Sequence, residues 1–538
     1  MNRSTRLFDY RRPARFFSLL LLAGVALLAG GCGGGGNTNT GYATSPGGDP
    51  VAIKVNTAAE IAQVSNADYN KNVNGLITGA TLQGWIDNWK KNRPSGITGR
   101  LIILQINRKD PISGNEYYIT PKPTQGVFTY SIISDTSAKS RLVMSRSNGV
   151  TTTRAMVLDG ASMDKFLHDY GIDPTQDMIV FAMGVGGYFA NMQMGRGWYL
   201  FRYWGVASSH LAVLDGGANS TAVMNPSYLG STATCDETSV AATTSPATTA
   251  ADGSIATSLR TGSTIAAYDA TTGKLTDSCS LPESGQVSVK NLPQDNTALQ
   301  ATLEDVMNVV KGQATAFIWD ARSTGEYGAT QGVKTGPYLG IDFRNGGAKQ
   351  GHPKGALNLR YKFLLMTDGS YRYKPKATLQ SYMDGNLVDG GQFLSYNAGS
   401  LVPVGAGKAY QSGETIITYC ETTYRAMITG IAAGVVLGLP VRFYDGAMVE
   451  WNAMVNFPDK NGQPILPADS PWRTDTASTS VFAYNTNTAI APRQIDDAYA
   501  AHANAIILAD KAYKRGTTSG SGAGGGSSVP LPPNPCGG

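Results

Sequence analysis

One cysteine of this chain stands where nucleophilic chemistry is possible. Residues 415–419 (TIITY) have the β-branched composition of a buried strand and lead directly into Cys420, and residues 425–437 are small and apolar enough for a buried helix. A residue between such a strand and helix lies at the sheet edge where α/β folds bind ligands. Backbone N–H groups of the intervening loop and the helix N-terminus would stabilise a thiolate or a persulfide. We therefore predict that Cys420 is the catalytic nucleophile.

The loop after this cysteine is short and carries charges of both signs. The residues that we expect to bind the substrate are Glu421, Thr422, Thr423, Tyr424 and Arg425. The Cys-x4-Arg spacing is shorter than the Cys-x5-Arg loop that phosphatases wrap around a phosphoryl group, which argues against phosphatase chemistry. An acid beside the cysteine disfavours the thiolate and repels anionic donors. Arg425 either binds a donor anion or pairs with Glu326 or Glu421, and the sequence leaves both possibilities open.

Short apolar strands alternate with helices in both halves of the chain, which predicts an α/β fold with parallel sheets. In the second half the expected elements are a helix at 299–311, strands at 316–319, 415–419 and 441–444, and a helix at 425–437 that ends at Gly438. In the first half they are helices at 82–89 and 162–169, strands at 101–106, 178–181 and 211–214, and a helix through Tyr199, Phe201 and Trp204. A glycine-rich turn at 184–187 takes the place of the Cys420 loop there.

Four landmarks in the second half occur in the order typical of the rhodanese family, also called sulfurtransferases. They are Trp319-Asp320-Ala321-Arg322 with Glu326-Tyr327, the segment 351–358 (GHPKGALN), the loop from Tyr419-Cys420 to Arg425-Ala426, and Tyr444-Asp445-Gly446 with Glu450-Trp451. Residues 296–455 therefore resemble this family. Residues 76–220 are similar to the non-catalytic first domain of two-domain rhodaneses. The resemblance implies two tandem rhodanese-like domains, each a parallel sheet with helices on both faces.

The resemblance also implies a reaction and its participants. Cys420 would hold sulfane sulfur as a persulfide and pass it to a thiol or another nucleophilic acceptor. The substrate would be a small sulfur or selenium compound, and no cofactor is implied. Asp320, Arg322 and Glu326 would support the site, the first two as structural partners at the strand end. Family members that use thiosulfate or mercaptopyruvate tend to carry a cation where Glu326 stands, so we expect a different donor.

The first half cannot use the family's nucleophile, because no cysteine lies between Cys32 and Cys235. Its expected role is to pack against the second half and to wall one side of the cleft. Cys235 and Cys279 fall between the halves and could form a disulfide in an oxidising compartment, worth about 4 kcal/mol in the chain-entropy model.

The first 31 residues have the features of an export signal. Five arginines precede an apolar run at 16–28, which is too short to span a bilayer as a permanent anchor. Small residues then lead into Cys32, which resembles the lipidated cysteine of a bacterial lipobox; an ordinary signal peptide cleaved nearby is the alternative. We expect a lipid-anchored protein of the cell envelope, and Gly33 after the cysteine favours the outer membrane.

Composition divides the chain and excludes some functions. The first 31 residues hold five of 44 basic and one of 39 acidic residues, so the remainder is nearly neutral and nucleic-acid binding is not indicated. Four histidines leave little scope for a metal site, and we expect none. The predicted segments are a signal peptide (1–31), a flexible tether (32–50), a first rhodanese-like domain (51–230), a linker with a Ser/Thr/Ala-rich insertion (231–295), a second domain with Cys420 (296–460), an extension (461–515) and a disordered tail (516–538).

Three functions remain open on the sequence. The first is an envelope sulfurtransferase with a small-molecule or protein acceptor. The second is a non-enzymatic rhodanese-like lipoprotein that acts as a binding or assembly component of an envelope complex, which the acidic loop and the long insertions favour. The third is a redox protein in which Cys420 cycles through a disulfide with a partner. A structural role for a buried Cys420 is the alternative to all three.

Overall fold

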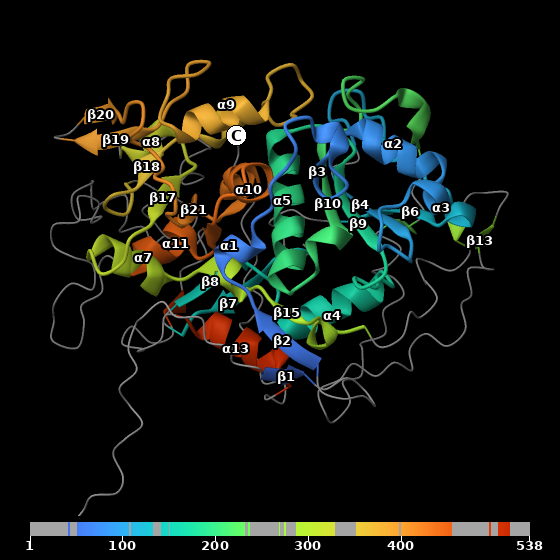
Figure 1. The fold of residues 1–538 in the computed structure, drawn as a ribbon, viewed down its shortest axis with the longest axis horizontal. Helices are drawn as coiled ribbons and strands as arrows, with labels where there is room; N and C mark the ends of the chain where they lie inside the picture. The colour runs from blue at the N-terminus through green and yellow to red at the C-terminus, as the bar shows by residue number, and fades with distance from the viewer. Residues whose placement is uncertain are drawn as a thin grey trace, which may run out of the picture. The chain divides into compact units, whose positions relative to one another are not determined.

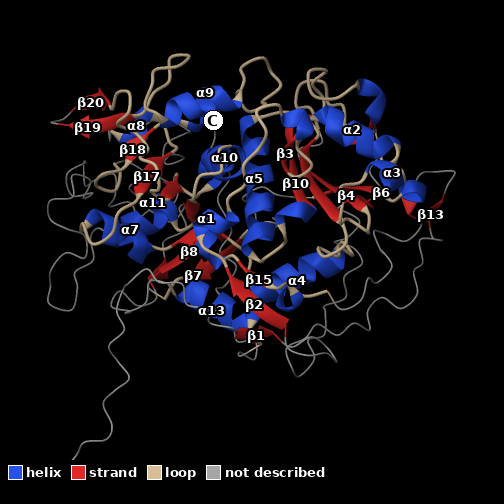
Figure 2. Ribbon diagram, in the orientation of Figure 1, coloured by secondary structure: helices blue, strands red, loops and turns tan. Residues whose placement is uncertain are grey.

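The computed structural model contains two large β-sheets, one in each half of the chain, with helices packed on their faces (Figures 1 and 2). It describes residues 41–43, 51–106, 109–132, 141–149, 151–231, 235–236, 268–269, 274–275, 287–328, 351–397, 400–454, 494–495 and 504–516. The signal peptide, Cys32, Cys279 and most of the predicted linker and tail lie outside these ranges, so those predictions stay predictions. Within the described ranges, every helix is too short or too polar to span a bilayer.

The sheet of the first half is entirely parallel. Its strands in spatial order are β12 (Cys235–Asp236), β6 (Val127–Ser131), β4 (Leu101–Ile106), β9 (Met178–Met183), β10 (Leu211–Gly217) and β3 (Gly75–Ile77). Successive residues of β4 enter different cores, Leu101 and Ile103 one and Ile102 and Leu104 the other. This alternation means that both faces of the sheet are covered.

Four helices cover those two faces. They are α2 (Gly79–Asp87) and α3 (Trp89–Asn92) on one face and α4 (Gly160–Asp169) and α5 (Tyr188–Tyr203) on the other. Helix α5 lies in the interior because it carries large aromatic side chains such as Trp198 and Phe201, which are at most 1% exposed. The first half therefore has the predicted parallel sheet with helices on both faces.

The sheet of the second half adds an antiparallel edge to a parallel centre. Its strands in spatial order are β16 (Gln300–Ala301), β22 (Val441–Tyr444), β21 (Ile416–Tyr419), β17 (Phe317–Asp320), β18 (Leu357–Asn358), β19 (Leu394–Asn397) and β20 (Ser400–Pro403). The first five are parallel, and β19 and β20 are antiparallel. This edge hairpin departs from the all-parallel sheet that the sequence predicts.

Helices also cover both faces of the second sheet. They are α7 (Leu303–Val310) and α11 (Ala447–Met454) on one face and α9 (Lys376–Met383) and α10 (Tyr424–Ile431) on the other, with the short α8 (Thr324–Tyr327) after β17. The predicted helix at 299–311 begins later, because residues 300–301 pair with β22 as a strand. The predicted helix at 425–437 is an α-helix followed by a π-helical turn, Ala432–Val436, and Gly438 has a left-handed φ of 75°.

The two sheets share one topology. Apart from β12, the first sheet has five parallel strands, as the second sheet does. Numbered by their order in the chain, these five are arranged 3-2-4-5-1 in each half, as β6-β4-β9-β10-β3 in the first and β18-β17-β21-β22-β16 in the second. The same connections therefore bring the turn after β9 and the Cys420 loop after β21 to matching places in their sheets. This is the repeated pattern that the sequence predicts.

Helices α5 and α10 pack against each other at the centre, between the two sheets (Figure 1). A Cβ atom on Gly195 would lie 2.6 Å from the Cβ of Met427, so the close approach requires glycine on α5. The aromatic rings of Tyr199 on α5 and Phe443 on β22 extend the contact, with centroids 4.8 Å apart. One hydrophobic core runs through both halves as a result.

Two aspartates, one near the end of β10 and one after β22, each accept a hydrogen bond from a backbone N–H of the opposite half. Asp445, after β22, accepts the N–H of Val157 at 2.7 Å, and Asp215, near the end of β10, accepts the N–H of Tyr373 at 2.7 Å. Asp445 additionally binds Arg196 of α5 through both guanidinium nitrogens, at 2.5 and 3.1 Å, with both side chains fully buried. This ion pair ties the central helix of the first half to the second half.

The last described helix, α13 (Ala505–Lys514), belongs to the segment predicted only as an extension. It packs on the first half, where Asp510 forms an ion pair with Arg146 at 2.6 Å and accepts a hydrogen bond from the hydroxyl of Tyr203 at 2.7 Å. The ammonium of Lys514 donates to the carbonyls of Trp204 and Val289 at 2.8 and 3.0 Å. The chain therefore returns from the second half to complete the first.

Smaller elements frame this core. They are β1 (Gly41–Ala43), β2 (Val51–Val55) and β15 (Gln294–Asp295) in one sheet, β7 (Met144–Ser147), β8 (Thr151–Met156) and β23 (Gln494–Ile495) in another, the pairs β5 (Tyr118–Ile119) with β11 (Leu229–Gly230) and β13 (Tyr268–Asp269) with β14 (Lys274–Leu275), and helix α1 (Ala58–Ile61).

Replacing Arg196 with methionine is expected to lower the free energy of unfolding by about 3–5 kcal/mol, because Asp445 then remains as a buried charge without its cation. Guanidinium chloride unfolding measures the loss. The matched control is Arg141→Met, which removes a guanidinium that is 25% exposed and 3.3 Å from Asp169, and should cost about 1 kcal/mol or less. Equal losses in the two variants would contradict the role assigned to Arg196.

Candidate active site

Cys420 lies between the end of β21 and the start of α10, as the sequence predicts. Its side chain is fully buried, and its carbonyl accepts the N–H of Met448 from α11. Thr423, which precedes the helix, has a left-handed φ of 64° and donates its hydroxyl to the carbonyl of Tyr444 at 2.7 Å. The loop is therefore held by one contact to α11 and one to the end of β22 as it turns from strand to helix.

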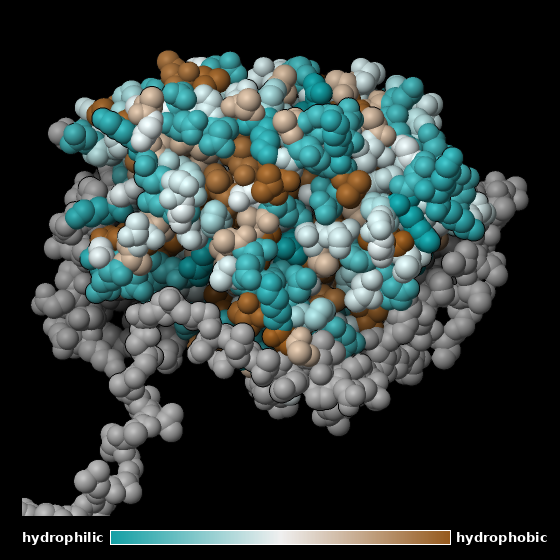
Figure 3. All heavy atoms as spheres, in the orientation of Figure 1, coloured by the Kyte–Doolittle hydropathy of each residue, from teal (hydrophilic) through white to brown (hydrophobic). Residues whose placement is uncertain are grey.

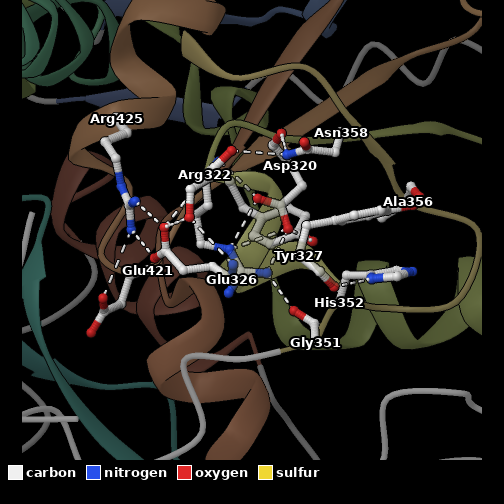
Figure 4. Close-up of polar contacts among 12 residues, drawn as sticks. Asp320, Arg322, Glu326, Tyr327, Gly351, His352, Ala356, Asn358, Glu421 and Arg425 are labelled. Carbon is white, nitrogen blue, oxygen red and sulfur yellow. Dashed lines mark hydrogen bonds and ion pairs between the residues drawn. The ribbon is translucent and has the colours of Figure 1, made fainter. Parts of the chain in front are cut away.

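Arg425 forms an ion pair with Glu326, which decides between the two possibilities that the sequence leaves open. Nη1 and Nη2 each lie 2.7 Å from one oxygen of Glu326, a bidentate arrangement, and Nη2 also lies 3.8 Å from the carboxylate of Glu421 (Figure 4). The guanidinium thus points at two carboxylates of the protein. Its charge is engaged before any donor anion arrives.

Glu326 is ionised in this arrangement. Burial alone would raise the pKa of its carboxyl, but the bonded Arg425 outweighs burial, and the hydroxyl of Ser323 adds to the effect, so the pKa of Glu326 falls well below its ordinary value. The same hydroxyl caps helix α8 through the N–H of Glu326. Glu326 is therefore an anion held in a fixed position beside the loop.

Asp320 and Arg322 form a second buried ion pair beside the first (Figure 4). Arg322 donates from Nε and Nη2 to the carboxylate of Asp320, at 3.0 and 2.5 Å, and also to the carbonyl of Gly351. The hydroxyl of Tyr419, the residue before the cysteine, donates to Asp320 at 2.7 Å. Both side chains are fully buried, which fits the structural role expected of them.

The segment 351–358 packs under this pair. Asn358 donates its side-chain amide to the carbonyls of Asp320 and Arg322, at 2.9 Å each. His352 stacks on Tyr327 with ring centroids 3.7 Å apart, and its Nδ1 lies 2.8 Å from the carbonyl of Tyr327. Burial lowers the pKa of His352 to about 3, so the imidazole is neutral near pH 7. Its contacts are those of a residue that supports the turn.

Among the two buried ion pairs and Glu421, carboxylates outnumber guanidinium groups, and Lys362 lies near enough for the charge of Arg425 to lower its pKa. Three carboxylates, Asp320, Glu326 and Glu421, face two guanidinium groups, Arg322 and Arg425. All five side chains are at least nine-tenths buried, so water screens the excess negative charge poorly. Such a site disfavours a doubly charged anion next to the cysteine.

Sequence reasoning missed the residues that close the site on its far side. Phe189 of α5 stacks on Tyr424 of the loop, with ring centroids 5.7 Å apart, and Arg196 lies over the same tyrosine ring at 5.9 Å. Lys362 lies over the ring of Tyr188 at 4.7 Å, and burial together with the charges of Arg360 and Arg425 lowers its pKa. No short-range pattern marks these residues, because their partners are far away in the sequence.

The remaining predicted sites are placed only in part. Cys235 lies in β12, but its proposed partner Cys279 is outside the described residues, so the disulfide stays a prediction. In the described part of the chain, no three His, Cys, Asp or Glu side chains gather as a metal site would require. Gly184 follows β9 at the point where Cys420 follows β21, and so the first half has the turn without the thiol.

Residues 302–454 match the family model described as the rhodanese-like domain. The second half thus contains a rhodanese-like domain. The match spans both ion pairs, Cys420 and the following helix. No curated protein matches the chain.

Solved structures with a similar chain path include the following three proteins. The Tum1 protein from Saccharomyces cerevisiae is 15% identical over 71% of this chain and 96% of its own, with a TM-score of 0.39. The 3-mercaptopyruvate sulfotransferase SseA from Escherichia coli is 14% identical over 70% and 98%, with a TM-score of 0.37. The anaerobic ergothioneine biosynthesis enzyme from Chlorobium limicola, in complex with trimethyl histidine, is 12% identical over 73% and 71%, with a TM-score of 0.41. At these TM-scores the likenesses carry no argument about function.

The Glu326–Arg425 pair should make stability depend on acid pH. A carboxyl with a lowered pKa in the folded protein contributes stability that is fully present above its unfolded pKa, near 4.5, and is lost as the pH falls below it. The isosteric variant Glu326→Gln lacks this contribution. The difference in unfolding free energy between wild type and variant is expected to be largest near pH 7 and to shrink from about pH 5 downward. Urea unfolding across this range measures it, and a constant difference would contradict the assignment.

Proposed function

We propose that this chain is a sulfurtransferase that carries sulfane sulfur on Cys420. The observation that supports the proposal most directly is the position of the thiol between β21 and α10 inside a domain that matches the rhodanese-like family. The turn and the helix N-terminus provide N–H groups and positive potential that favour an anionic sulfur. A persulfide anion is the species that such an environment would stabilise.

The reaction is a double displacement. The Cys420 thiolate attacks the terminal sulfur of a donor persulfide, R–S–SH, so that a new S–S bond forms on the enzyme while the donor S–S bond breaks and a thiolate leaves. The proton of the Cys420 thiol passes through solvent to the leaving thiolate. An acceptor thiolate then attacks the outer sulfur, takes it as its own persulfide and restores the Cys420 thiolate. No external oxidant or reductant is required.

The charge balance of the site limits which classes of sulfur donor can approach Cys420. With Arg425 bound to Glu326 and 3.8 Å from Glu421, an incoming donor meets two carboxylates beside the cysteine. Thiosulfate is a dianion, and its approach to a buried carboxylate is unfavourable. We propose a low-molecular-weight or protein persulfide, or the corresponding selenium compound, as the donor.

The location and the architecture of the whole chain belong to the same proposal. The leader and Cys32 support a lipid-anchored envelope protein, with the outer membrane favoured, and the tether at 32–50 would hold the folded part away from the bilayer. The shared 3-2-4-5-1 strand order supports a first domain of the same type that lacks the nucleophile. In this proposal the first half supports the loop through α5.

The burial of the loop favours a second candidate, a rhodanese-like binding or assembly lipoprotein without turnover. None of the six residues from Cys420 to Arg425 is more than 7% exposed, so a donor must displace neighbours to reach the sulfur. A binding role would use the outside of the fold instead. The face in Figure 3 carries hydrophobic residues in small groups among hydrophilic ones, without one dominant apolar patch.

Cyanolysis separates the two candidates. After incubation with a persulfide donor, the wild-type protein should release about one thiocyanate per chain when treated with cyanide, and Cys420→Ser should release none. The serine variant keeps the size and burial of the side chain, and circular dichroism checks its fold. If neither thiol persulfides nor selenium analogues load the wild type, the sulfurtransferase proposal fails and the binding role is favoured.

Neutralising Glu421 should relax the discrimination against thiosulfate. Glu421→Gln removes the excess negative charge with little change in shape and is expected to raise kcat/KM for thiosulfate roughly tenfold, while kcat/KM for a neutral persulfide changes little. The control is Glu304→Gln, which removes an exposed carboxylate on α7. An unchanged ratio between the two donors would show that charge does not set donor choice.

A further inference from the structure

A pocket of about 450 Å³ opens at the carboxyl edge of the first sheet, away from the Cys420 loop. Thr78 and Asp215 mark this edge, since they follow Ile77 of β3 and Leu214 of β10, which are register partners in adjacent parallel strands. Open α/β sheets bind ligands in crevices outside the carboxyl ends of their strands. The volume is in the range of small-molecule sites.

The floor of the pocket holds a buried acid with an uncommitted oxygen. Asp215 is 4% exposed, and in the described part of the chain its carboxylate makes one hydrogen bond, from the N–H of Tyr373 to Oδ1. Burial raises the pKa of Asp215 to about 7, which the Tyr373 N–H and Arg372 oppose and Asp368 reinforces. Among the described residues none donates a hydrogen bond to its second oxygen, Oδ2, and Asp215 lines the pocket. A buried carboxylate in this state gains from a cationic donor.

The rim of the pocket holds a base. Arg372 is about a third exposed, and its Nε and Nη2 reach Ser370 and Asp368, at 3.2 Å each, on the outer side of the loop. None of the described hydrogen bonds uses its Nη1. The acid on the floor and the base on the rim thus border one cavity, together with polar groups of Asp68, Asn70 and Thr78.

Comparison with the second half shows that the fold does not require this arrangement. Asp445 matches Asp215 in position and in accepting an N–H from the other half, but it is neutralised by Arg196. Counted from the strand ends Met183 and Tyr419, the residue that matches Arg196 is Ala432. The protein therefore lacks, at Asp215, the cation that it supplies at Asp445.

We propose that this pocket binds a small zwitterion of the α-amino acid type, with its ammonium group on Asp215 and its carboxylate on Arg372. A simple anion would meet Asp215 and Asp68, and a simple amine would leave Nη1 of Arg372, whose Nη2 already pairs with Asp368, without an acceptor. A zwitterion satisfies both groups. The site is independent of the sulfur chemistry proposed for Cys420.

The test is calorimetric titration of the full chain with L-α-amino acids, each beside the amine that lacks the carboxylate and the acid that lacks the amine. At least one amino acid should bind, and its two partial analogues should bind at least about tenfold more weakly, because each loses one charge-assisted contact. Asp215→Asn and Arg372→Gln should each weaken binding by a similar factor. Asn keeps an oxygen for the Tyr373 N–H, and Arg372 lies at the rim, so that both variants are expected to fold.

Asp87→Asn, which changes an exposed acid outside the pocket, serves as the matched control and should bind like the wild type. Three results would overturn the proposal: no binding of any amino acid to the folded wild type, equal binding of the amine alone, or binding that both pocket variants retain. Persulfide loading of Cys420, measured on the same samples, reports separately on the sulfurtransferase proposal.

Discussion

The guanidinium of Arg196 is completely buried between the two halves, and Asp445 neutralises it there. A buried charge without a partner costs several kcal/mol, so α5 can occupy the centre only where the end of β22 delivers that carboxylate. The same strand end supplies the carbonyl of Tyr444 that receives the hydroxyl of Thr423. The position of the Cys420 loop thus depends on the ion pair that joins the halves.

The first half contributes to the position of the Cys420 loop through helix α5. Helix α5 contributes Arg196, the ring of Phe189 against Tyr424, and the glycine that lets α10 approach. Helix α13 in turn holds the first half through Asp510 and Lys514. The Cys420 loop packs against its own half on one side. On the other side it packs against the first half, which has the same strand order. Access to Cys420 is therefore a property of the whole fold and not of the loop alone.

The parts of this structure that could be predicted from sequence are those set by local pattern. Strands β4 and β22 have the predicted bounds because each is a short, mostly apolar run, interrupted by Gln105 in β4 and by Arg442 in β22. The helix at 299–311 was placed too early, because its apolar spacing continues into residues that pair with β22. The capping box of Thr302 and Asp305 was the local signal for its true start. Likewise, Asp320 and Arg322 are neighbours whose pairing a short segment can encode.

The electrostatics of the site could not be predicted in the same way. Glu326 and Arg425 are 99 residues apart, and Arg196 and Asp445 are 249 apart, so their pairing is decided only when the sheets are assembled. Before assembly Arg425 is equally suited to a donor anion and to either nearby acid. Once Glu326 is fixed by the cap of α8, the bidentate geometry makes it the better partner, and the loop becomes a site with excess negative charge. The fold thereby makes Arg425 a structural tie between the Cys420 loop and helix α8.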